Sequence, residues 1–322
     1  MFRYNYSGTT DGTSGPVSYE PRAVRHPAAA TRTASTEVAM RITLAQVDSR
    51  LGDVDANVER AEQVLVDAAR DGSDLVVFPE LHLSGYSIGE VVDDPSIRPD
   101  DPRMQRLAKL TRRAGMLIGF AEAQSHGLHC YNSAAYFEDG LLVHVHRKLY
   151  LPNYATFEER KHFLPGQSSR AFPVLGGRHR AAALICNDAW QPQLAFIAAQ
   201  DGALVLLVPT CSAQSMFPER YDSSSYWRSI TRFYGRMFQL YVVFVNRVGT
   251  EGVLNFWGGS HVVDPWGEVI AEAAEGEEHV LTVEIDIGDV GRRRRDIPLV
   301  REARLGLLRR EIDRLLEEGG DL

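Results

Sequence analysis

Apolar residues recur with two different periods along residues 40–290 of this chain. Short runs rich in Val, Ile, Leu and aromatic side chains are typical of strands, whereas apolar residues spaced three and four apart are typical of helices. Strands are predicted at 41–47 (RITLAQV) and 74–79 (DLVVFP), and between them Val58, Ala61 and Leu65 define one face of a helix. These elements predict a β-α-β unit.

The same two periods continue through the rest of the chain. Asp139-Gly140 lies between two strand-like segments, which is a strong signal for a β-hairpin. Because crossovers and hairpins both occur, we expect an α/β fold in which two mixed sheets pack face to face with helices outside. Further strands are predicted at 116–122, 132–138, 141–147, 181–186, 203–208, 241–246, 259–263, 268–273 and 279–285, and further helices at 102–114, 192–200, 226–238 and 302–318.

Two segments have simple structural interpretations. The predicted helix at 226–238 carries an apolar stripe that we expect to pack against a sheet or another helix. The basic run Arg292–Arg295 is expected to be solvated or to contact a second copy of the chain, because an acidic protein is a poor partner for nucleic acid. The apolar stripe consists of Tyr226, Ile230, Phe233, Tyr234, Met237 and Phe238.

Residues 1–39 differ from the rest of the chain. They are rich in Ser, Thr, Gly and Pro and show no helical or strand period. Such a segment buries too little apolar surface to offset its ordering entropy, so a disordered tail is predicted. Met40 precedes the first strand and is a candidate alternative translation start. Residues 40–322 are then expected to form one domain.

Composition narrows the class of partner. The chain has 322 residues, of which 44% are hydrophobic and 24% charged, as in ordinary globular proteins. Its net charge of −8 argues against nucleic acid or an anionic membrane as the main partner, so a small-molecule ligand is expected. Three cysteines without a CxxC pair indicate a reducing compartment. Without a membrane span or secretory signal in the sequence, we expect a cytoplasmic location.

Glu80 and Lys148 each fall where a predicted strand ends, which is where α/β folds expose functional groups. Pro79 stops one strand and leaves Glu80 at its tip, where partial burial would raise the pKa of the carboxyl toward the range of a general base. Lys148 ends the second strand of the hairpin, and a fixed ammonium there would stabilise developing negative charge on a substrate oxygen. The plainer interpretations are a solvated loop glutamate and a surface lysine.

Cys186 and Glu159 are the other two candidates. Cys186 ends an apolar strand and precedes the helix predicted at Pro192, whose positive end would favour the nucleophilic thiolate. Glu159 lies in a charged cluster between aromatic residues and could orient the lysine. The alternatives are a packing cysteine and a solvated turn of paired charges. Cys130 and Cys211 lack such a setting and are interpreted as structural.

The four segments together resemble the nitrilase, or carbon–nitrogen hydrolase, superfamily. Their order is FPE with Glu80, RKLYLPNY with Lys148, FEERKHF with Glu159 and LICNDAW with Cys186, and the resemblance covers residues 40–290. Residues 148–163 look most like the glutaminase domain of glutamine-dependent NAD synthetases and their stand-alone amidase relatives. The resemblance implies a four-layer α-β-β-α sandwich, a homodimer or larger homo-oligomer, and a Glu-Lys-Cys triad that needs no metal or organic cofactor.

The resemblance also implies a reaction. Cys186 would attack the carbonyl of a small linear amide to form a thioester, Glu80 would move the protons, Lys148 would hold the oxyanion, and Glu159 would orient Lys148 or the substrate. Ammonia or an amine would be released. A nitrile-hydrolysing enzyme and a catalytically silent binding subunit remain alternatives, whereas a redox cysteine protein is disfavoured because no CxxC pair is present.

Two departures from the glutaminase pattern concern the substrate. Members of that type often carry Glu directly after the nucleophile, where this chain has Asn187. The sequence also lacks the SGGxDS loop of an ATP-binding synthetase domain, so this chain is not expected to make NAD itself. His144 and His146 would share one face of a strand and could bind a metal, but surface histidines are the expected interpretation.

Overall fold

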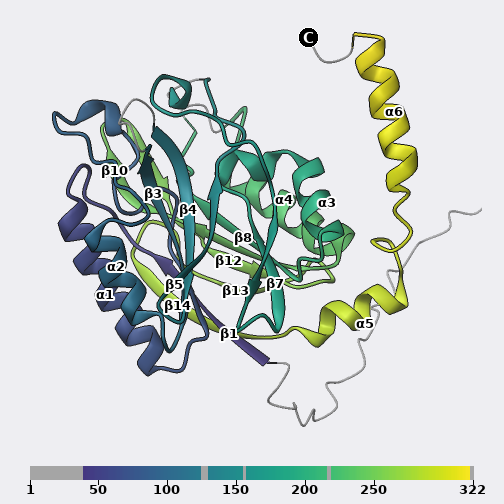
Figure 1. Ribbon diagram of the computed structural model, residues 1–322, viewed down its shortest axis with the longest axis horizontal. Helices are drawn as coiled ribbons and strands as arrows, with labels where there is room; N and C mark the ends of the chain where they lie inside the picture. Colours follow the sequence, from purple (N-terminus) through teal and green to yellow (C-terminus); the bar gives the residue numbers. More distant parts are fainter. Residues whose placement is uncertain (1–38, 125–129, 155–156, 216–218, 320–322) are drawn as a thin grey trace, which may run out of the picture. The chain divides into compact units, whose positions relative to one another are not determined.

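The computed structural model describes residues 39–124, 130–154, 157–215 and 219–319 (Figure 1). The predicted tail therefore lies outside the described residues, except for Ala39, which begins the first strand. None of the helices in these ranges has the length and apolar character that crossing a membrane requires.

The first sheet has six strands in the order β14-β1-β2-β3-β4-β5. Its central strands β1, β2 and β3 are parallel, and β14 and the β4–β5 hairpin run antiparallel to their neighbours at the two edges. Asp139 and Gly140 both have positive φ (52° and 80°), as the predicted two-residue hairpin turn requires. The strand bounds are β1 Ala39–Gln46, β2 Leu75–Val77, β3 Gly115–Ala123, β4 Cys130–Glu138, β5 Leu141–Arg147 and β14 His279–Asp286.

The second sheet has six strands in the order β13-β12-β9-β8-β7-β6, with β7, β8 and β9 parallel. A separate hairpin pairs β10 with β11. Strands β6, β10 and β11, of four residues each, are missing from the sequence prediction. The bounds are β6 Ala171–Val174, β7 His179–Ala183, β8 Val205–Thr210, β9 Tyr241–Asn246, β10 Val248–Glu251, β11 Leu254–Trp257, β12 His261–Val263 and β13 Val269–Glu272.

Three apolar clusters arrange these elements in four layers. One joins the facing sides of the two sheets and includes Leu44 and Val77 from the first and Val205 and Val243 from the second. Another packs α1 (Val54–Arg70) and α2 (Pro102–Leu110) on the first sheet, and a third packs α3 (Pro192–Gln200) and α4 (Ser223–Phe238) on the second (Figure 1). The predicted α-β-β-α sandwich of two mixed sheets is confirmed.

The prediction for the apolar stripe of α4 is confirmed for half of its residues, since Ile230, Tyr234 and Phe238 pack against the apolar cluster of the second sheet. The buried face of the helix is formed by Trp227, Thr231, Tyr234 and Gly235, and the other half of the stripe is exposed. The small Gly235 sets this orientation, because a Cβ there would lie 2.5 Å from the carbonyl oxygen of Asp264. The exposed members are Tyr226 (48%), Phe233 (49%) and Met237 (40%).

Two helices follow the sandwich, α5 (Gly288–Asp296) and α6 (Leu305–Glu317). The basic run on α5 is less solvated than expected. Arg294 is partly buried and donates to the carbonyl oxygen of Ala203, and Arg292 pairs with Asp286 and Asp289. These bonds attach α5 to the second sheet's helical layer and to the end of β14.

Candidate active site

The four predicted residues come from four separate chain segments. Glu80 follows β2, Lys148 directly follows β5, Glu159 begins the 3-10 helix η2 (Glu159–Lys161), and Cys186 begins η3 (Cys186–Trp190). Strands β2 and β5 point the same way in the first sheet, so their carboxyl ends share an edge. Glu80 and Lys148 are therefore brought together there by the fold.

Lys148 connects both carboxylates. Its Nζ donates to Oε1 of Glu80 and to Oε1 of Glu159, each at 2.6 Å, and all three side chains are buried. Burial acts to lower the pKa of Lys148, but the charges of Glu159 and Glu80 outweigh it and hold the pKa well above its ordinary value. The Lys148 side chain is therefore a cation. The plainer interpretations, a surface lysine and solvated glutamates, do not apply, because all three side chains are buried.

Glu80 is held at both carboxylate oxygens. Its Oε1 accepts from Nδ2 of Asn132 at 2.7 Å, and its Oε2 accepts from the backbone N–H of Cys211 at 2.7 Å. Gly119 on β3 lets this segment lie close to the sheet, because a Cβ there would lie 2.4 Å from the carbonyl oxygen of Pro79. Sequence reasoning missed Asn132 and the Cys211 amide, neither of which carries a local signal.

Glu159 has one bonded and one unbonded oxygen. Oε1 accepts from the hydroxyl of Tyr86 at 2.7 Å as well as from Lys148, while buried Oε2 has no hydrogen-bond partner within the described ranges. Burial raises the pKa of Glu159 to about 7, against the opposing effect of Lys148. Tyr86 is itself fixed, since its backbone N–H donates to the carboxylate of Glu251.

Cys186 lies in a left-handed backbone conformation, with φ of 44°. This conformation is unfavourable for a residue with a side chain and is found mostly at functional sites, where the surroundings enforce it. Here the buried carboxylate of Asp188 enforces it by accepting from the backbone N–H of Ile185 at 3.2 Å. The same carboxylate accepts from the N–H groups of Leu149 and Tyr150 at 2.9 and 2.8 Å. One side chain therefore ties the turn at Cys186 to the segment after Lys148.

The expected thiolate is not supported. Burial and the charge of Glu80 raise the pKa of the Cys186 thiol well above its ordinary value, although Lys148 acts in the other direction. The helix that was expected to lower the pKa begins only at Pro192, and the intervening η3 is one short 3-10 segment. The thiol therefore carries its proton at rest, and attack requires a base.

The two histidines on β5 are not surface residues. Nε2 of His146 lies 2.9 Å from Oδ2 of Asp188, with both side chains buried. His144 stacks on Phe172 with ring centroids 4.5 Å apart, and burial lowers its pKa to about 4. No group of three His, Cys, Asp or Glu side chains that could hold a metal occurs among the described residues.

A cavity of about 580 Å³ gives access to Cys186. This size suits a small molecule, and the wall combines aromatic rings with a few polar groups, as ligand sites commonly do. Its lining residues are Tyr86, Pro152, Tyr154, Phe157, Cys186, Asn187, Trp190, Gln191, Ser212, Ala213, Gln214, Ser215, Arg220, Tyr221, Ser223 and Trp227.

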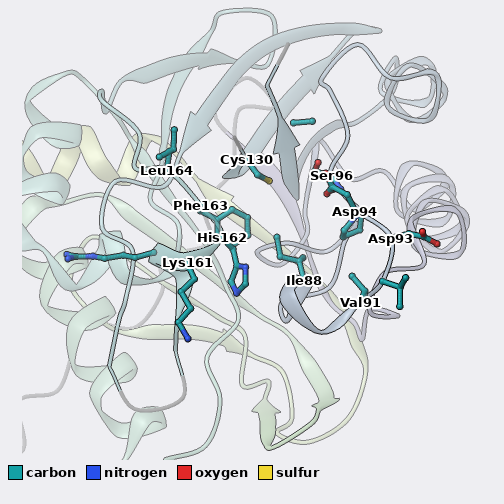
Figure 2. A pocket seen from close by; sticks show the side chains of 14 residues that line it. Ile88, Val91, Asp93, Asp94, Ser96, Cys130, Lys161, His162, Phe163 and Leu164 are labelled. Atoms are coloured by element: carbon teal, nitrogen blue, oxygen red, sulfur yellow. The ribbon is translucent and has the colours of Figure 1, made fainter. Parts of the chain in front are cut away.

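The other two cysteines lie in different surroundings. Cys130 lines a second cavity of about 450 Å³, beside Ile88 and Phe163 (Figure 2), and burial raises the pKa of its thiol to about 12. The buried thiol of Cys211 lies 3.0 Å from the carbonyl oxygen of Glu80. Among the three cysteines, Cys186 is the one that lines the cavity of about 580 Å³.

Comparison with known proteins identifies the family. The family model described as carbon-nitrogen hydrolase matches residues 41–295. The chain belongs to the carbon-nitrogen hydrolase family. The hydrolase is 34% identical over 253 residues to the glutamine-dependent NAD(+) synthetase of Thermotoga maritima, covering 78% of this chain and 42% of the synthetase. It is 27% identical to the citrullinase of Francisella tularensis, covering 79% and 92% of the two chains.

Other relatives agree with this assignment. The N-carbamoylputrescine amidase of Solanum lycopersicum is 27% identical, with 78% of this chain and 88% of the amidase covered. The carbon-nitrogen hydrolase of Helicobacter pylori superposes with a TM-score of 0.72 at 26% identity, covering 83% and 96% of the chains. The chain thus spans less than half of the synthetase and most of the length of the amidase and the citrullinase. Its family and its amidase relatives support amide hydrolysis in general.

Proposed function

We propose that this hydrolase cleaves the carbon–nitrogen bond of a small linear amide through a thioester on Cys186, without a cofactor. The observation that carries the proposal is the buried Glu80–Lys148–Glu159 cluster, with N–O distances of 2.6 Å, together with the substrate-sized cavity that Cys186 lines. A silent binding subunit would have no use for an ammonium and two carboxylates buried in this way, since such burial is expensive.

In the acylation step Glu80 takes the proton of the Cys186 thiol while sulfur attacks the amide carbon. Negative charge then moves to the former carbonyl oxygen, where the ammonium of Lys148 stabilises it, assisted by the backbone N–H of Asn187. Protonated Glu80 gives its proton to the nitrogen, the carbon–nitrogen bond breaks, and ammonia or an amine leaves. The product on the protein is a thioester.

In the second step water attacks the thioester carbon. Glu80 accepts a proton from this water, Lys148 again stabilises the oxyanion, and the carbon–sulfur bond breaks. The proton on Glu80 returns to the thiolate, which restores the resting thiol and releases the carboxylic acid. The high pKa of the thiol agrees with this cycle, because sulfur loses its proton only as it attacks.

Glu159 has two tasks in this mechanism. Its Oε1 holds Lys148 in place at 2.6 Å. Its unbonded and buried Oε2 is suited to accept a hydrogen bond from the substrate NH₂ group, which would orient the amide for attack. Tyr86 keeps the carboxylate in this orientation through its hydroxyl.

The mechanism is tested by intact-mass detection of the acyl-enzyme, combined with measurement of ammonia release from a panel of primary amides. Cys186→Ala should lose both the adduct and turnover, whereas Cys130→Ala, the matched change in the other cavity, should keep both. Turnover that persists in Cys186→Ala would contradict the proposal. The matched nitriles belong in the panel, because hydrolysis of nitriles in preference to amides would replace amide with nitrile as the substrate class.

We also propose that residues 40–322 act as one domain and that copies of the chain self-associate through α6. No residue of α6 is buried, and Leu305, Leu308 and Ile312 border an apolar groove of about 650 Å³ with α3. Arg309 and Asp313 at this groove pair with each other at 3.6 Å, so their charges are balanced within α6. The exposed apolar side chains are therefore the part of this surface that would contact a second copy related by twofold symmetry.

A reducing, cytoplasmic location is also proposed. All three cysteines of the chain are free, and a nucleophilic thiol functions only while it stays reduced. Loss of ammonia release after mild oxidation, and its recovery with a thiol reductant, would support this requirement, whereas activity unaffected by oxidation would oppose it.

A further inference from the structure

The described lining of the proposed active-site cavity carries positive charge and no negative charge. Arg220 carries the only formal charge of a basic or acidic side chain among its described lining residues, which include no Asp or Glu. From the described part of the wall, a substrate therefore meets one cation and no carboxylate.

The hydrogen bonds of Ser212 place a donor on the same wall of the cavity. Its Oγ accepts from Nε1 of Trp227 at 3.0 Å and from Nε1 of Trp257 at 3.1 Å, which occupies both of its lone pairs. The Ser212 proton must then point to Oγ of Ser223, 2.7 Å away. Ser223 is left with its own proton to donate, either directly into the cavity or to the Tyr221 hydroxyl beside it. This wall consequently offers hydrogen to an acceptor.

Asn187 contributes no negative charge. Its Nδ2 donates to the carbonyl oxygen of Tyr150 at 3.1 Å, which anchors this neutral side chain at the position directly after the nucleophile. An ammonium group on the substrate would thus find no carboxylate among the described lining residues and would be repelled by Arg220. Glu159 lies outside this lining, its Oε1 already accepts from Lys148, and the mechanism assigns its Oε2 to the substrate NH₂ group.

We infer that the substrate is the monoamide of a small dicarboxylic acid, an amide with a carboxylate at its far end and no ammonium group. The inference rests on the proposed function and specifies its substrate. The amide lies at Cys186, and the remote carboxylate pairs with the guanidinium of Arg220 while the Ser223–Tyr221 pair donates to it. The aromatic walls contact the methylene chain between the two ends.

Four amides with the same five-carbon chain test this inference. Glutaramate has the remote carboxylate, pentanamide is neutral, 5-aminopentanamide has an ammonium in place of the carboxylate, and glutamine is glutaramate with an added α-ammonium. Charge-assisted hydrogen bonds predict a kcat/KM for glutaramate about 10- to 100-fold above that of pentanamide. Glutamine should fall well below glutaramate, and 5-aminopentanamide below pentanamide.

Variants at Arg220 separate charge recognition from general damage. Arg220→Gln should lower kcat/KM for glutaramate, mainly through KM, so that the ratio of the glutaramate value to the pentanamide value falls to near one. Arg220→Glu should reverse the order, so that 5-aminopentanamide exceeds glutaramate. Arg70→Gln, the same change at the exposed end of α1, should leave all four values as in the wild type.

The outcomes distinguish this inference from the proposed function. Equal kcat/KM for glutaramate and pentanamide, with Cys186-dependent turnover of both, would overturn the substrate class and leave the mechanism intact. Equal loss on all four amides in Arg220→Gln would likewise overturn it, because the arginine would then act on the fold. If none of these amides nor any in the wider panel acylates Cys186, the proposed function itself fails.

Discussion

Nε2 of His146 lies 2.9 Å from Oδ2 of Asp188, and both side chains are buried. His146 precedes Lys148 by two residues and Asp188 follows Cys186 by two residues. This pair therefore links the strand that positions the proposed oxyanion-binding lysine with the turn that positions the proposed nucleophile.

Replacing Asp188 should damage both segments. The two oxygens of Asp188 accept from the backbone N–H groups of Leu149, Tyr150 and Ile185. In Asp188→Asn an NH₂ group replaces one of these oxygens, so at least one backbone N–H loses its acceptor. We expect a loss of about 2–4 kcal/mol in the free energy of unfolding and a fall of about 10- to 100-fold in kcat. Urea unfolding and amide turnover measure the two effects. Asp71→Asn, at the exposed end of α1, is the control and should change neither.

Glu80→Gln should abolish base catalysis while keeping the shape of the site. The amide still offers an oxygen to Lys148 or to the Cys211 amide, but it cannot take the thiol proton. A fall of about 10²- to 10⁴-fold in kcat/KM is expected. The rate of Cys186 acylation, followed by intact mass, should fall in parallel. Acylation at the wild-type rate would remove Glu80 from the role of base.

Glu159 should make stability depend on pH. Its pKa rises from 4.5 to about 7 in the folded protein, so the folded state binds this proton more tightly than the unfolded state. The stabilisation is complete below about pH 4.5 and is lost as pH rises through about 7. Subtracting the pH profile of Glu159→Gln from that of the wild type, each from urea unfolding, should reveal this fall. A flat difference between pH 4.5 and 8 would contradict the assigned pKa.

Gly119→Ala tests whether close packing positions Glu80. The new Cβ would lie 2.4 Å from the backbone atoms Pro79 O and Leu81 N, which must move. We expect a loss of about 1–3 kcal/mol in the free energy of unfolding and a lower kcat, because Glu80 shifts with its neighbours. Gly306→Ala on α6 is the matched change, since its Cβ would meet only the end of the Arg310 side chain at 3.7 Å. That variant should keep full activity.

If copies of the chain associate through α6, a charge introduced at its apolar groove should weaken the oligomer. Leu308→Glu places a carboxylate at the apolar groove and should shift the sedimentation coefficient toward that of the monomer. The folded monomer should remain, because the Leu308 side chain is already 42% exposed. Val253→Glu, at a residue 81% exposed on another surface, should leave the oligomer unchanged. A wild-type protein that sediments as a monomer at all concentrations would exclude this interface.

Local patterns in the sequence determined much of the architecture. The strand and helix periods, the Asp139-Gly140 turn and the strand-terminating Pro79 are short-range signals, because each depends on the conformational preferences of a few adjacent residues. The four-layer α/β sandwich followed from their order. Glu80, Lys148, Glu159 and Cys186 were identified together by the order of four motifs, and the structure brings the three charged residues into direct contact.

Only the tertiary structure decided how these residues are held and what state they occupy. Asp188, Asn132 and the Cys211 amide act across 39, 52 and 131 positions of sequence, distances at which no local pattern exists. The orientation of α4 depends on a backbone contact at Gly235, which apolar periodicity alone cannot register. The protonated state of Cys186 follows from burial beside Glu80. Electrostatics and packing depend on neighbours in space, and those neighbours exist only after the chain has folded.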